Sequence, residues 1–228
     1  MAATTRRGLT PFYAVLGVIA LAGVALLAYL AAGPGSAGGV PANVVVQPSD
    51  TAGFRGYVMG ADTAPVEVVE YADYQCPACQ GFATVQMPDI RRDLIATGRV
   101  RWRYRDFPLS QHRHARLAAH AAACADEQGK FWEMHDLIYA GQADWAFRGN
   151  AGGAFRDYAR QLGLELGRYD GCMDSNRYAG RIQASFEEGQ RIGVQSTPSF
   201  LIGGRIYAGA LASDRVRQLV DSIASPGR

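Results

Sequence analysis

Residues Glu70–Phe82, EYADYQCPACQGF, contain two cysteines, Cys76 and Cys79, that are separated only by Pro77 and Ala78. Two thiols at this spacing can bind a metal, form a small structural disulfide or take part in thiol–disulfide exchange. The flanking segments distinguish these uses, because they determine which structural element carries each sulfur.

The cysteine pair lies between a short strand and a helix. Residues Val66–Tyr71 (VEVVEY) are rich in β-branched residues and predict a strand. Apolar periodicity over Phe82–Ala96 predicts a helix that is kinked at Pro88. The alternation over Val100–Phe107 predicts a second strand, and residues 113–192 have mainly helical character.

The C-terminal part returns to strands. Residues Phe200–Ile202 and Arg205–Ala208 predict a hairpin across the Gly203–Gly204 turn, and Ser213–Ile223 predicts a closing helix. Without the helical block, the order is βαβ followed by ββα, the minimal order of a thioredoxin fold. The predicted fold class is therefore α/β, a thioredoxin fold with an inserted helical domain.

An uncharged apolar segment lies near the N-terminus. Residues 11–32 follow Arg6 and Arg7, and as a helix they would be about 33 Å long, enough to cross a hydrocarbon core of about 30 Å. The arginine pair predicts that residues 1–10 are cytoplasmic and that everything after Gly33 is extracytoplasmic, or periplasmic. We expect an uncleaved transmembrane anchor. Cleavage at the small residues that follow it, giving a secreted protein, is the alternative.

The remaining chain divides into a linker and one folded domain with an insertion. Residues 33–41, GPGSAGGVP, predict a flexible segment, and we place the linker at residues 33–53, with folded structure expected to start near Val44 or Phe54. We place the first part of the thioredoxin fold at residues 54–110, the helical insert at 111–180 and the second part of the fold at 181–228.

The charge of the chain argues against a nucleic-acid partner. Arg6 and Arg7 account for the whole net charge of +2, so the part beyond the apolar segment has no formal net charge. Nucleic-acid binding requires a basic surface.

The position of the two thiols favours redox chemistry. Cys76 follows a strand and lies at the first turn of a helix, where unpaired N–H groups and the helix dipole favour its thiolate. Cys79, one turn later, can attack a mixed disulfide formed at Cys76. Pro77 suits the first helical position, because its missing N–H would have no partner there.

Zinc is the main alternative. A structural zinc site usually needs a second close pair of ligands, and Cys124 and Cys172 are far apart in the sequence. Three histidines cluster near the start of an alanine-rich segment, without an adjacent acidic residue: His112, His114 and His120. We predict no metal. A purely structural link within the CxxC pair would close too small a loop to constrain the unfolded chain.

Glu70 has two interpretations. It can be a surface carboxylate, or it can be a buried acid beneath Cys79 that relays protons during exchange. Alternation places Glu70 on the face of Val66 and Val68 and Glu67 on the other face, so each face has one glutamate and the pattern leaves both interpretations open.

Three segments resemble the DsbA-like thiol:disulfide oxidoreductases, in particular the bacterial branch whose helical insert has its own cysteine pair. The resemblance covers roughly residues 56–223, about three quarters of the chain. The segments are APVEVVEYADYQCPACQGF, RWRYRDFPLSQHRHARLAAHAAACADEQGKFWEMHDLIY and EGQRIGVQSTPSFLIGGRIYAGA.

The resemblance implies a role for each site residue. It implies that Cys76 is the exposed nucleophile, Cys79 its buried partner and Glu70 the buried acid. It also implies that Thr197 and Pro198 form a cis-proline loop that faces the disulfide.

Two further expectations follow from the resemblance. Cys124 and Cys172 are expected to form a structural disulfide within the insert, which the chain's four cysteines and an oxidising compartment allow. The dipeptide Pro77-Ala78 departs from the Pro-His of the best-known strong oxidants in the family, so we expect a moderate oxidant.

The sequence therefore predicts an extracytoplasmic oxidase that introduces disulfides into exported proteins and uses no dissociable cofactor. Its expected partners are exported proteins with reduced or mispaired cysteines and a quinone-linked membrane reoxidase. A disulfide reductase or isomerase, or a redox-inert peptide-binding module, is the alternative.

Overall fold

The computed structural model describes residues 10–31 and 39–224, with side chains described from residue 13 to 24 in the first range. The expected cytoplasmic N-terminus, up to residue 9, and the start of the expected linker, residues 33–38, lie outside the described residues. The chain divides into two units, residues 1–38 and 39–228. The first contains the 22-residue helix α1 (Thr10–Ala31). Within the described residues, no helix combines the length and the apolarity required to cross a membrane.

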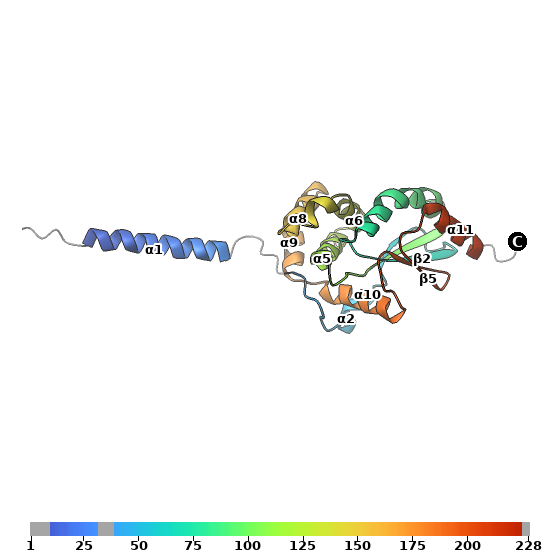
Figure 1. Ribbon diagram of the computed structural model, residues 1–228, viewed down its shortest axis with the longest axis horizontal. Helices are drawn as coiled ribbons and strands as arrows, with labels where there is room; N and C mark the ends of the chain where they lie inside the picture. Colours follow the sequence, from blue (N-terminus) through green and yellow to red (C-terminus); the bar gives the residue numbers. More distant parts are fainter. Residues whose placement is uncertain (1–9, 32–38, 225–228) are drawn as a thin grey trace, which may run out of the picture. The chain divides into compact units, whose positions relative to one another are not determined.

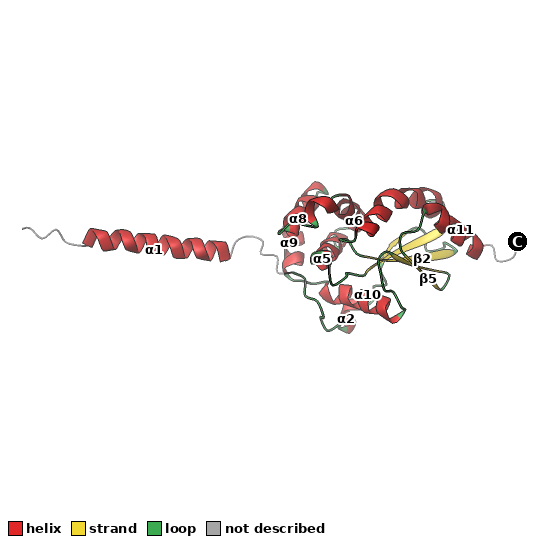
Figure 2. Cartoon of the chain, in the orientation of Figure 1, coloured by secondary structure: helices red, strands yellow, loops and turns green. Residues whose placement is uncertain are grey.

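Within residues 39–224, five strands form one mixed sheet (Figures 1 and 2). They are β1 (Tyr57–Met59), β2 (Val66–Ala72), β3 (Val100–Asp106), β4 (Ser199–Ile202) and β5 (Arg205–Ala208). Their order across the sheet is β1-β3-β2-β4-β5. β2 is parallel to β3, and the other neighbouring pairs are antiparallel. The strand that leads to the cysteine pair is therefore central, and its backbone is fixed by pairing on both edges.

The helical path after β2 is longer and less regular than the predicted kinked helix. It consists of four consecutive segments: α3 (Pro77–Gly81), the π-helical η1 (Phe82–Gln86), α4 (Met87–Ile90) and the π-helical η2 (Arg91–Ile95). Pro88 lies at the start of α4. Because Pro88 cannot donate to the carbonyl four residues earlier, a wider π turn on its N-terminal side keeps the path helical without that bond.

The helical insert packs as a bundle beside the sheet. Its helices are α5 (Ala115–Asp126), α6 (Phe131–Ala140), α7 (Gln142–Trp145), α8 (Ala151–Gln161) and α9 (Leu166–Asp174). Almost every residue of α5 is buried, and its seven alanines allow α6, α8 and α9 to approach it closely. This alanine-rich helix is the centre of the insert's core.

The two C-terminal helices complete the layers around the sheet. Val66 and Val68 of β2 face the helical path after the cysteines and α11 (Ser213–Ala224). Tyr71, on the opposite face, packs in the cluster that includes Phe186 of α10 (Ala179–Arg191). The predicted boundary between residues 180 and 181 falls inside α10, which contacts β3, so the return to the sheet begins at the start of this helix.

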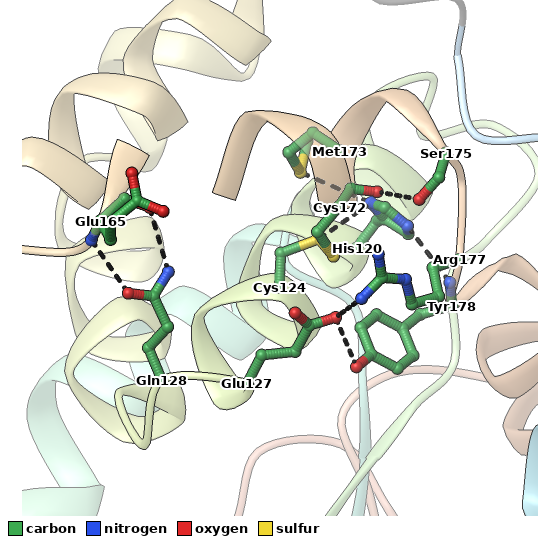
Figure 3. Close-up of a disulfide and its surroundings, with 10 residues drawn as sticks. All are labelled: His120, Cys124, Glu127, Gln128, Glu165, Cys172, Met173, Ser175, Arg177 and Tyr178. Carbon is green, nitrogen blue, oxygen red and sulfur yellow. Dashed lines mark hydrogen bonds and ion pairs between the residues drawn. A yellow bond between two sulfur atoms is a disulfide. The ribbon is translucent and has the colours of Figure 1, made fainter. Parts of the chain in front are cut away.

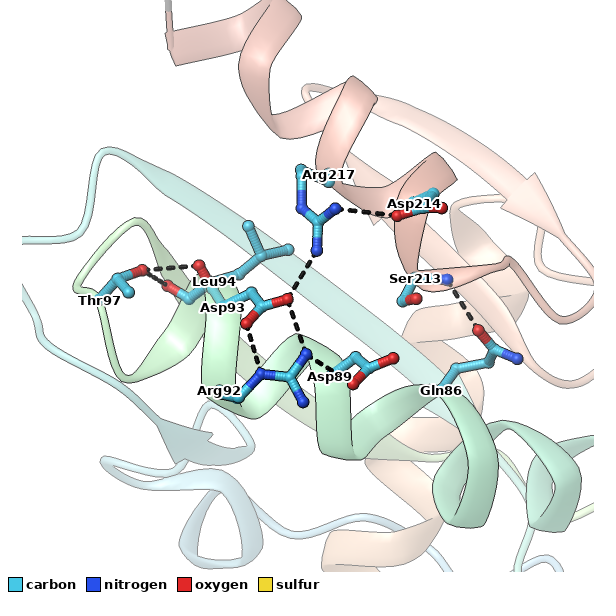
Figure 4. A network of polar contacts seen from close by, with 9 residues as sticks. All are labelled: Gln86, Asp89, Arg92, Asp93, Leu94, Thr97, Ser213, Asp214 and Arg217. Atoms are coloured by element: carbon cyan, nitrogen blue, oxygen red, sulfur yellow. Dashed lines mark hydrogen bonds and ion pairs between the residues drawn. The ribbon is translucent and has the colours of Figure 1, made fainter.

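Polar contacts fix α11 against the helical path (Figure 4). The Arg217 guanidinium lies 2.7 Å from Asp93 Oδ2 and 2.9 Å from Asp214 Oδ1. At the start of α11, the Ser213 N–H donates to Gln86 Oε1 at 2.8 Å. The contacts with Asp93 and Gln86 tie the N-terminal turns of α11 to the helical path, whereas Asp214 belongs to α11 itself.

Part of the predicted linker is folded. Val40 is buried in the core of the insert, and α2 (Pro48–Thr51) contacts α10. β1 then adds an antiparallel edge strand to β3. The compact unit therefore begins near residue 39, and the flexible composition of GPGSAGGVP does not extend over residues 40–53.

A close approach of α10 to Tyr71 and Phe107 gives a stability prediction. A Cβ on Gly189 would lie 2.6 Å from Phe107 Cδ2 and 3.1 Å from Tyr71 Cδ1. Gly189→Ala is therefore expected to lower the free energy of unfolding by about 1–3 kcal/mol through overpacking, measured by urea denaturation. Gly171→Ala in α9 is the control, because its Cβ would meet nothing within 4 Å and alanine is the better helix former. A Gly189→Ala protein as stable as the control variant would contradict this packing.

Candidate active site

Cys76 caps the N-terminus of α3. Its backbone is extended, with φ −74° and ψ 122°, and Pro77 occupies the first helical turn. The Cys76 N–H donates to the Asp73 carbonyl oxygen at 3.1 Å, and the Gln80 N–H donates to the Cys76 carbonyl oxygen at 3.1 Å. The chain thus turns sharply out of β2 and presents the Cys76 sulfur at the end of the helix where N–H groups are unpaired.

The surroundings of Cys76 favour its thiolate. Its pKa is lowered from 9.0 to about 5, first by a hydrogen bond from Cys79, then by Thr197 and by the backbone N–H groups of Cys79 and Ala78, against the opposing effect of burial. In the thiol form, Cys76 Sγ donates a hydrogen bond to the Thr197 carbonyl oxygen at 3.4 Å. The buried Thr197 hydroxyl has no partner of its own among the described residues, so it is free to donate when the thiolate forms.

The surroundings of Cys79 favour its thiol form. Burial raises its pKa well above the ordinary value, and the neighbouring Cys76 raises it further. Cys79 is fully buried, whereas 8% of Cys76 is exposed. Both are free cysteines in the structure. Cys76 is thus less exposed than the resemblance implies, because the Thr197 loop packs over it, but it is the more accessible of the two sulfurs.

The loop before β4 faces the cysteine pair. The Thr197–Pro198 peptide bond is cis, as the resemblance implies. Pro198 is buried, and its carbonyl oxygen accepts a hydrogen bond from the Gly209 N–H at 2.8 Å. Pro77 and Ala78, by contrast, are exposed on the first turn of α3.

Glu70 is buried, which excludes the surface carboxylate, while its role as a proton relay to Cys79 stays a prediction. It is 1% exposed, and its Oε2 accepts a hydrogen bond from Trp102 Nε1 at 3.0 Å. Burial raises its pKa from 4.5 to about 7, and the Trp102 hydrogen bond partly opposes this. The charge of Glu70 also contributes to the raised pKa of Cys79. Glu67, on the other face, is paired with Arg103 at 2.6 Å.

The insert also contributes to the site, which no sequence signal indicated. The buried Gln142 side chain donates to the carbonyl oxygens of Tyr74 at 2.7 Å and of Cys76 at 3.1 Å. Gln75 donates to the Ala146 carbonyl oxygen at 2.7 Å and accepts from the His114 N–H at 2.7 Å. The turn that carries Cys76 is therefore fixed from two segments that are distant in sequence.

Cys124 and Cys172 are joined by a disulfide that links α5 to α9 (Figure 3). The loop it closes spans 48 positions, for which the chain-entropy account gives about 4 kcal/mol of stabilisation. His120 Nδ1 lies 3.5 Å from Cys124 Sγ and 3.4 Å from Met173 Sδ, and its Nε2 accepts from the Tyr178 N–H at 3.2 Å. The ligand atoms of His120 and the two cysteines lie within 4.8 Å of one another. Because the two sulfurs are bonded together, neither is a thiolate that can bind a metal.

Comparison with known proteins gives the family. A family model described as thioredoxin matches residues 54–222. The oxidised structure of BdbD from Bacillus subtilis superposes with a TM-score of 0.67, at 25% identity, over 79% of this chain and 97% of BdbD. The chain therefore belongs to this thioredoxin family, and its structure is similar to that of the DsbA-like protein BdbD.

Other relatives differ in length. Disulfide bond formation protein D of Bacillus subtilis is 25% identical over 72% of this chain and 75% of its own length. A sodium/proton antiporter, NhaA 3 of Salinispora tropica, is 40% identical over 68% of this chain. The chain spans only 22% of that antiporter and 24% of another from Salinispora arenicola. Wolbachia pipientis α-DsbA1, at 19% identity and a TM-score of 0.66, shares the fold.

The raised pKa of Glu70 predicts a pH-dependent cost to stability. A carboxyl whose pKa rises from 4.5 to about 7 on folding binds more protons in the native state, so stability is lost as the pH increases across that range. Glu70→Gln keeps an acceptor for Trp102. It is expected to match the wild type below pH 4.5 and to be more stable by about 3 kcal/mol above pH 7.

Urea denaturation across this pH range measures the difference. Glu67→Gln is the control: it removes a partly exposed carboxyl that is paired with Arg103, and it gains no stability relative to the wild type as the pH rises. A constant difference between the wild type and Glu70→Gln at all pH values would refute the buried, proton-binding Glu70.

Proposed function

We propose that this protein is an extracytoplasmic thiol:disulfide oxidase that introduces disulfides into exported proteins through Cys76 and Cys79. The observation that carries the proposal is the difference between the two thiols. Cys76 has a pKa of about 5, and Cys79, in the same helical turn, has a pKa raised by burial. A stable Cys76 thiolate is a good leaving group and makes the enzyme disulfide easier to reduce, which is the property of an oxidant.

Each residue of the site then has a role in the exchange. A substrate thiolate attacks Cys76 Sγ of the Cys76–Cys79 disulfide, the S–S bond breaks, and Cys79 leaves with the electron pair. Glu70, buried nearby, supplies a proton to the Cys79 sulfur. A second substrate thiolate attacks the substrate sulfur of the mixed disulfide, which forms the substrate disulfide and releases Cys76 as a thiolate. The substrate is oxidised by two electrons and the enzyme pair is reduced.

The loop at Thr197 and Pro198 is the proposed substrate platform. The Thr197 carbonyl oxygen lies 3.4 Å from Cys76 Sγ. Thr197 and Pro198 are themselves buried, but the preceding residues Gln195 and Ser196 are exposed, and an extended substrate segment can add its backbone hydrogen bonds along this loop, as in strand addition. Pro77 and Ala78 form the opposite side of the approach, and the small Ala78 side chain leaves room for a polypeptide.

The location and the partners belong to the same proposal. Residues 11–32 carry no charge and follow an arginine pair in the sequence, which is the argument for a membrane anchor with the catalytic unit outside the cytoplasm. The Cys124–Cys172 disulfide agrees with an oxidising compartment. Repeated turnover requires reoxidation of Cys76 and Cys79, for which we propose a quinone-linked membrane partner.

The oxidase proposal predicts both a potential and an activity. In glutathione buffers, the purified full chain in detergent should have a reduction potential above about −200 mV, and the oxidised protein should introduce disulfides into reduced, unfolded ribonuclease A. Cys76→Ala should abolish the activity. Cys79→Ala should also be inactive, because it cannot form the Cys76–Cys79 disulfide. In buffers that contain glutathione disulfide, its Cys76 thiolate should displace glutathione and accumulate as a mixed disulfide with glutathione, because Cys79 is not there to attack that bond.

The competing activity has a distinct outcome. Pro77-Ala78 adds no imidazole or cation to the CxxC turn, which is the observation that keeps a reductase or isomerase as the second candidate. A potential near that of thioredoxin, about −270 mV, with no oxidation of ribonuclease A, would contradict the oxidase and favour the reductase.

A further inference from the structure

A buried aspartate connects the Cys76 turn to a histidine of the loop that follows β3. One oxygen of Asp73, Oδ1, accepts from the Gln75 N–H at 2.7 Å. The other, Oδ2, accepts from the Leu109 N–H at 2.7 Å and lies 2.8 Å from His112 Nδ1. The Asp73 carbonyl oxygen accepts the Cys76 N–H at 3.1 Å. Asp73 thus contacts both the nucleophile's backbone and the imidazole of His112.

The contacts of Asp73 also fix the orientation of the His112 ring. Both Asp73 oxygens accept hydrogen bonds, so the imidazole donates from Nδ1 and the proton of its neutral form lies on that nitrogen. Nε2 is left as the position that gains or loses a proton. The His112 side chain is 19% exposed and that of Asp73 is fully buried. The ring can therefore exchange protons with solvent, whereas the Asp73 carboxylate is excluded from solvent.

The charges near His112 favour its protonated form. Its pKa is raised, first by the hydrogen bond to Asp73 and also by the charges of Asp73 and Cys76, against a contribution from burial that lowers it. The Cys76 charge exists only after the disulfide is reduced. The pKa of His112 should therefore be higher in the reduced enzyme than in the oxidised enzyme.

The other charged groups around the loop are the same in both redox states. Arg113 on the same loop lowers the pKa of His114, and Arg148, beyond α7, is exposed and pairs with Asp144 at 3.9 Å. Asp106, at the end of β3, has a pKa raised by burial to about 7, to which Asp73 also contributes. These groups are present in both redox states, and only the Cys76 thiolate appears on reduction.

We propose that His112, held by Asp73, takes up a proton when the Cys76–Cys79 disulfide is reduced and, as an imidazolium, stabilises the Cys76 thiolate. This rests on the proposed oxidase function. The His112 imidazolium supplies from a distant loop the cation that Pro77-Ala78 does not supply within the CxxC turn. His112 is therefore a positioning and electrostatic residue, and the sulfur chemistry remains at the two cysteines.

The proton balance of the exchange is complete. Two substrate thiols and the enzyme disulfide give a substrate disulfide, the Cys76 thiolate and the Cys79 thiol, which leaves one proton. Where His112 is neutral in the oxidised enzyme, that proton binds Nε2, so the electrons go to the cysteine pair and the released proton goes to the imidazole.

His114, two residues later, provides a matched control. Its Nε2 is 2.8 Å from the Arg148 carbonyl oxygen, and burial lowers its pKa. A ring in this state donates to a carbonyl and is neutral, so it does not follow the charge on Cys76. His114→Gln removes an imidazole from the same loop without removing the proposed proton acceptor.

The test is the pH dependence of the redox equilibrium with glutathione, measured on the purified full chain in detergent. Above the pKa of Cys76, reduction by glutathione releases one proton, so the equilibrium constant rises tenfold per pH unit. In the wild type, uptake by His112 should flatten this slope in a window above 6.5, the ordinary pKa of histidine. His112→Gln should keep the full slope throughout and reduce the equilibrium constant on the order of tenfold at neutral pH.

Two further variants separate charge from structure. His112→Arg carries a permanent cation, so it should restore the equilibrium constant but not the flattened window. His114→Gln should behave as the wild type in both respects. A His112→Gln protein with the wild-type constant and the wild-type slope would overturn the proposal.

A second measurement uses only the wild-type protein. The NMR titration of the His112 ring in the oxidised and reduced wild-type protein should give a higher pKa after reduction, and equal values would overturn the proposal. Oxidation of ribonuclease A by the same wild-type preparation is scored separately. An active oxidase whose His112 pKa does not change with redox state refutes only the role of His112, whereas an inactive one refutes the oxidase function.

Discussion

The hydrogen bonds that converge on the Cys76 sulfur are the interaction on which the rest of the site depends. Cys79, Thr197 and the N–H groups at the start of α3 lower its pKa from 9.0 to about 5, which corresponds to on the order of 5 kcal/mol in favour of the thiolate. For Cys79, burial is the largest effect, and it raises the pKa. One helical turn therefore holds two chemically identical side chains in different protonation states.

The fold serves this arrangement by fixing the three segments that meet at the sulfur. β2 is paired on both edges, in register with β3 and β4, so the turn into α3 starts from a rigid strand. β4 carries the Thr197–Pro198 loop, and Gln142 of the insert holds the carbonyl oxygens of Tyr74 and Cys76. The insert is thus part of the active-site framework, and the disulfide between α5 and α9 stabilises that framework at a distance.

Local patterns predicted the central elements well. The strand before the cysteines, the helix start at Pro77, the hairpin of β4 and β5 and the closing helix at Ser213 all lie at or near their expected positions. Each is specified by nearby residues: β-branched runs, proline, a glycine turn or an N-cap. The three-residue β1 and the π-helical segments near Pro88 were missed, because neither has a distinct sequence pattern. The folded part begins before the expected start near Val44 or Phe54, because Val40 and α2 are held by contacts with the insert and with α10.

The parts of the site that the sequence left open also depend on contacts between distant segments. The two cysteines could be assigned from their spacing, but the burial of Glu70 could not, since each face of the strand has one glutamate. Its partner Trp102 lies on β3, and only the sheet register brings the two together. The contact between Asp73 and His112 joins residues 39 positions apart, so the sequence showed a histidine with no acidic neighbour.

The most direct test of this account is the pH dependence of alkylation of the reduced protein by iodoacetamide, with Cys79→Ala as a check that Cys76 is the residue modified. Because the thiolate is the reactive form, the account predicts that the rate at Cys76 rises through an apparent pKa of about 5 in the wild type. In Cys79→Ala that pKa should increase, since the largest contribution to the thiolate's stability is removed. An apparent pKa near 9 for the wild-type Cys76, the ordinary value for a thiol, would contradict the central claim.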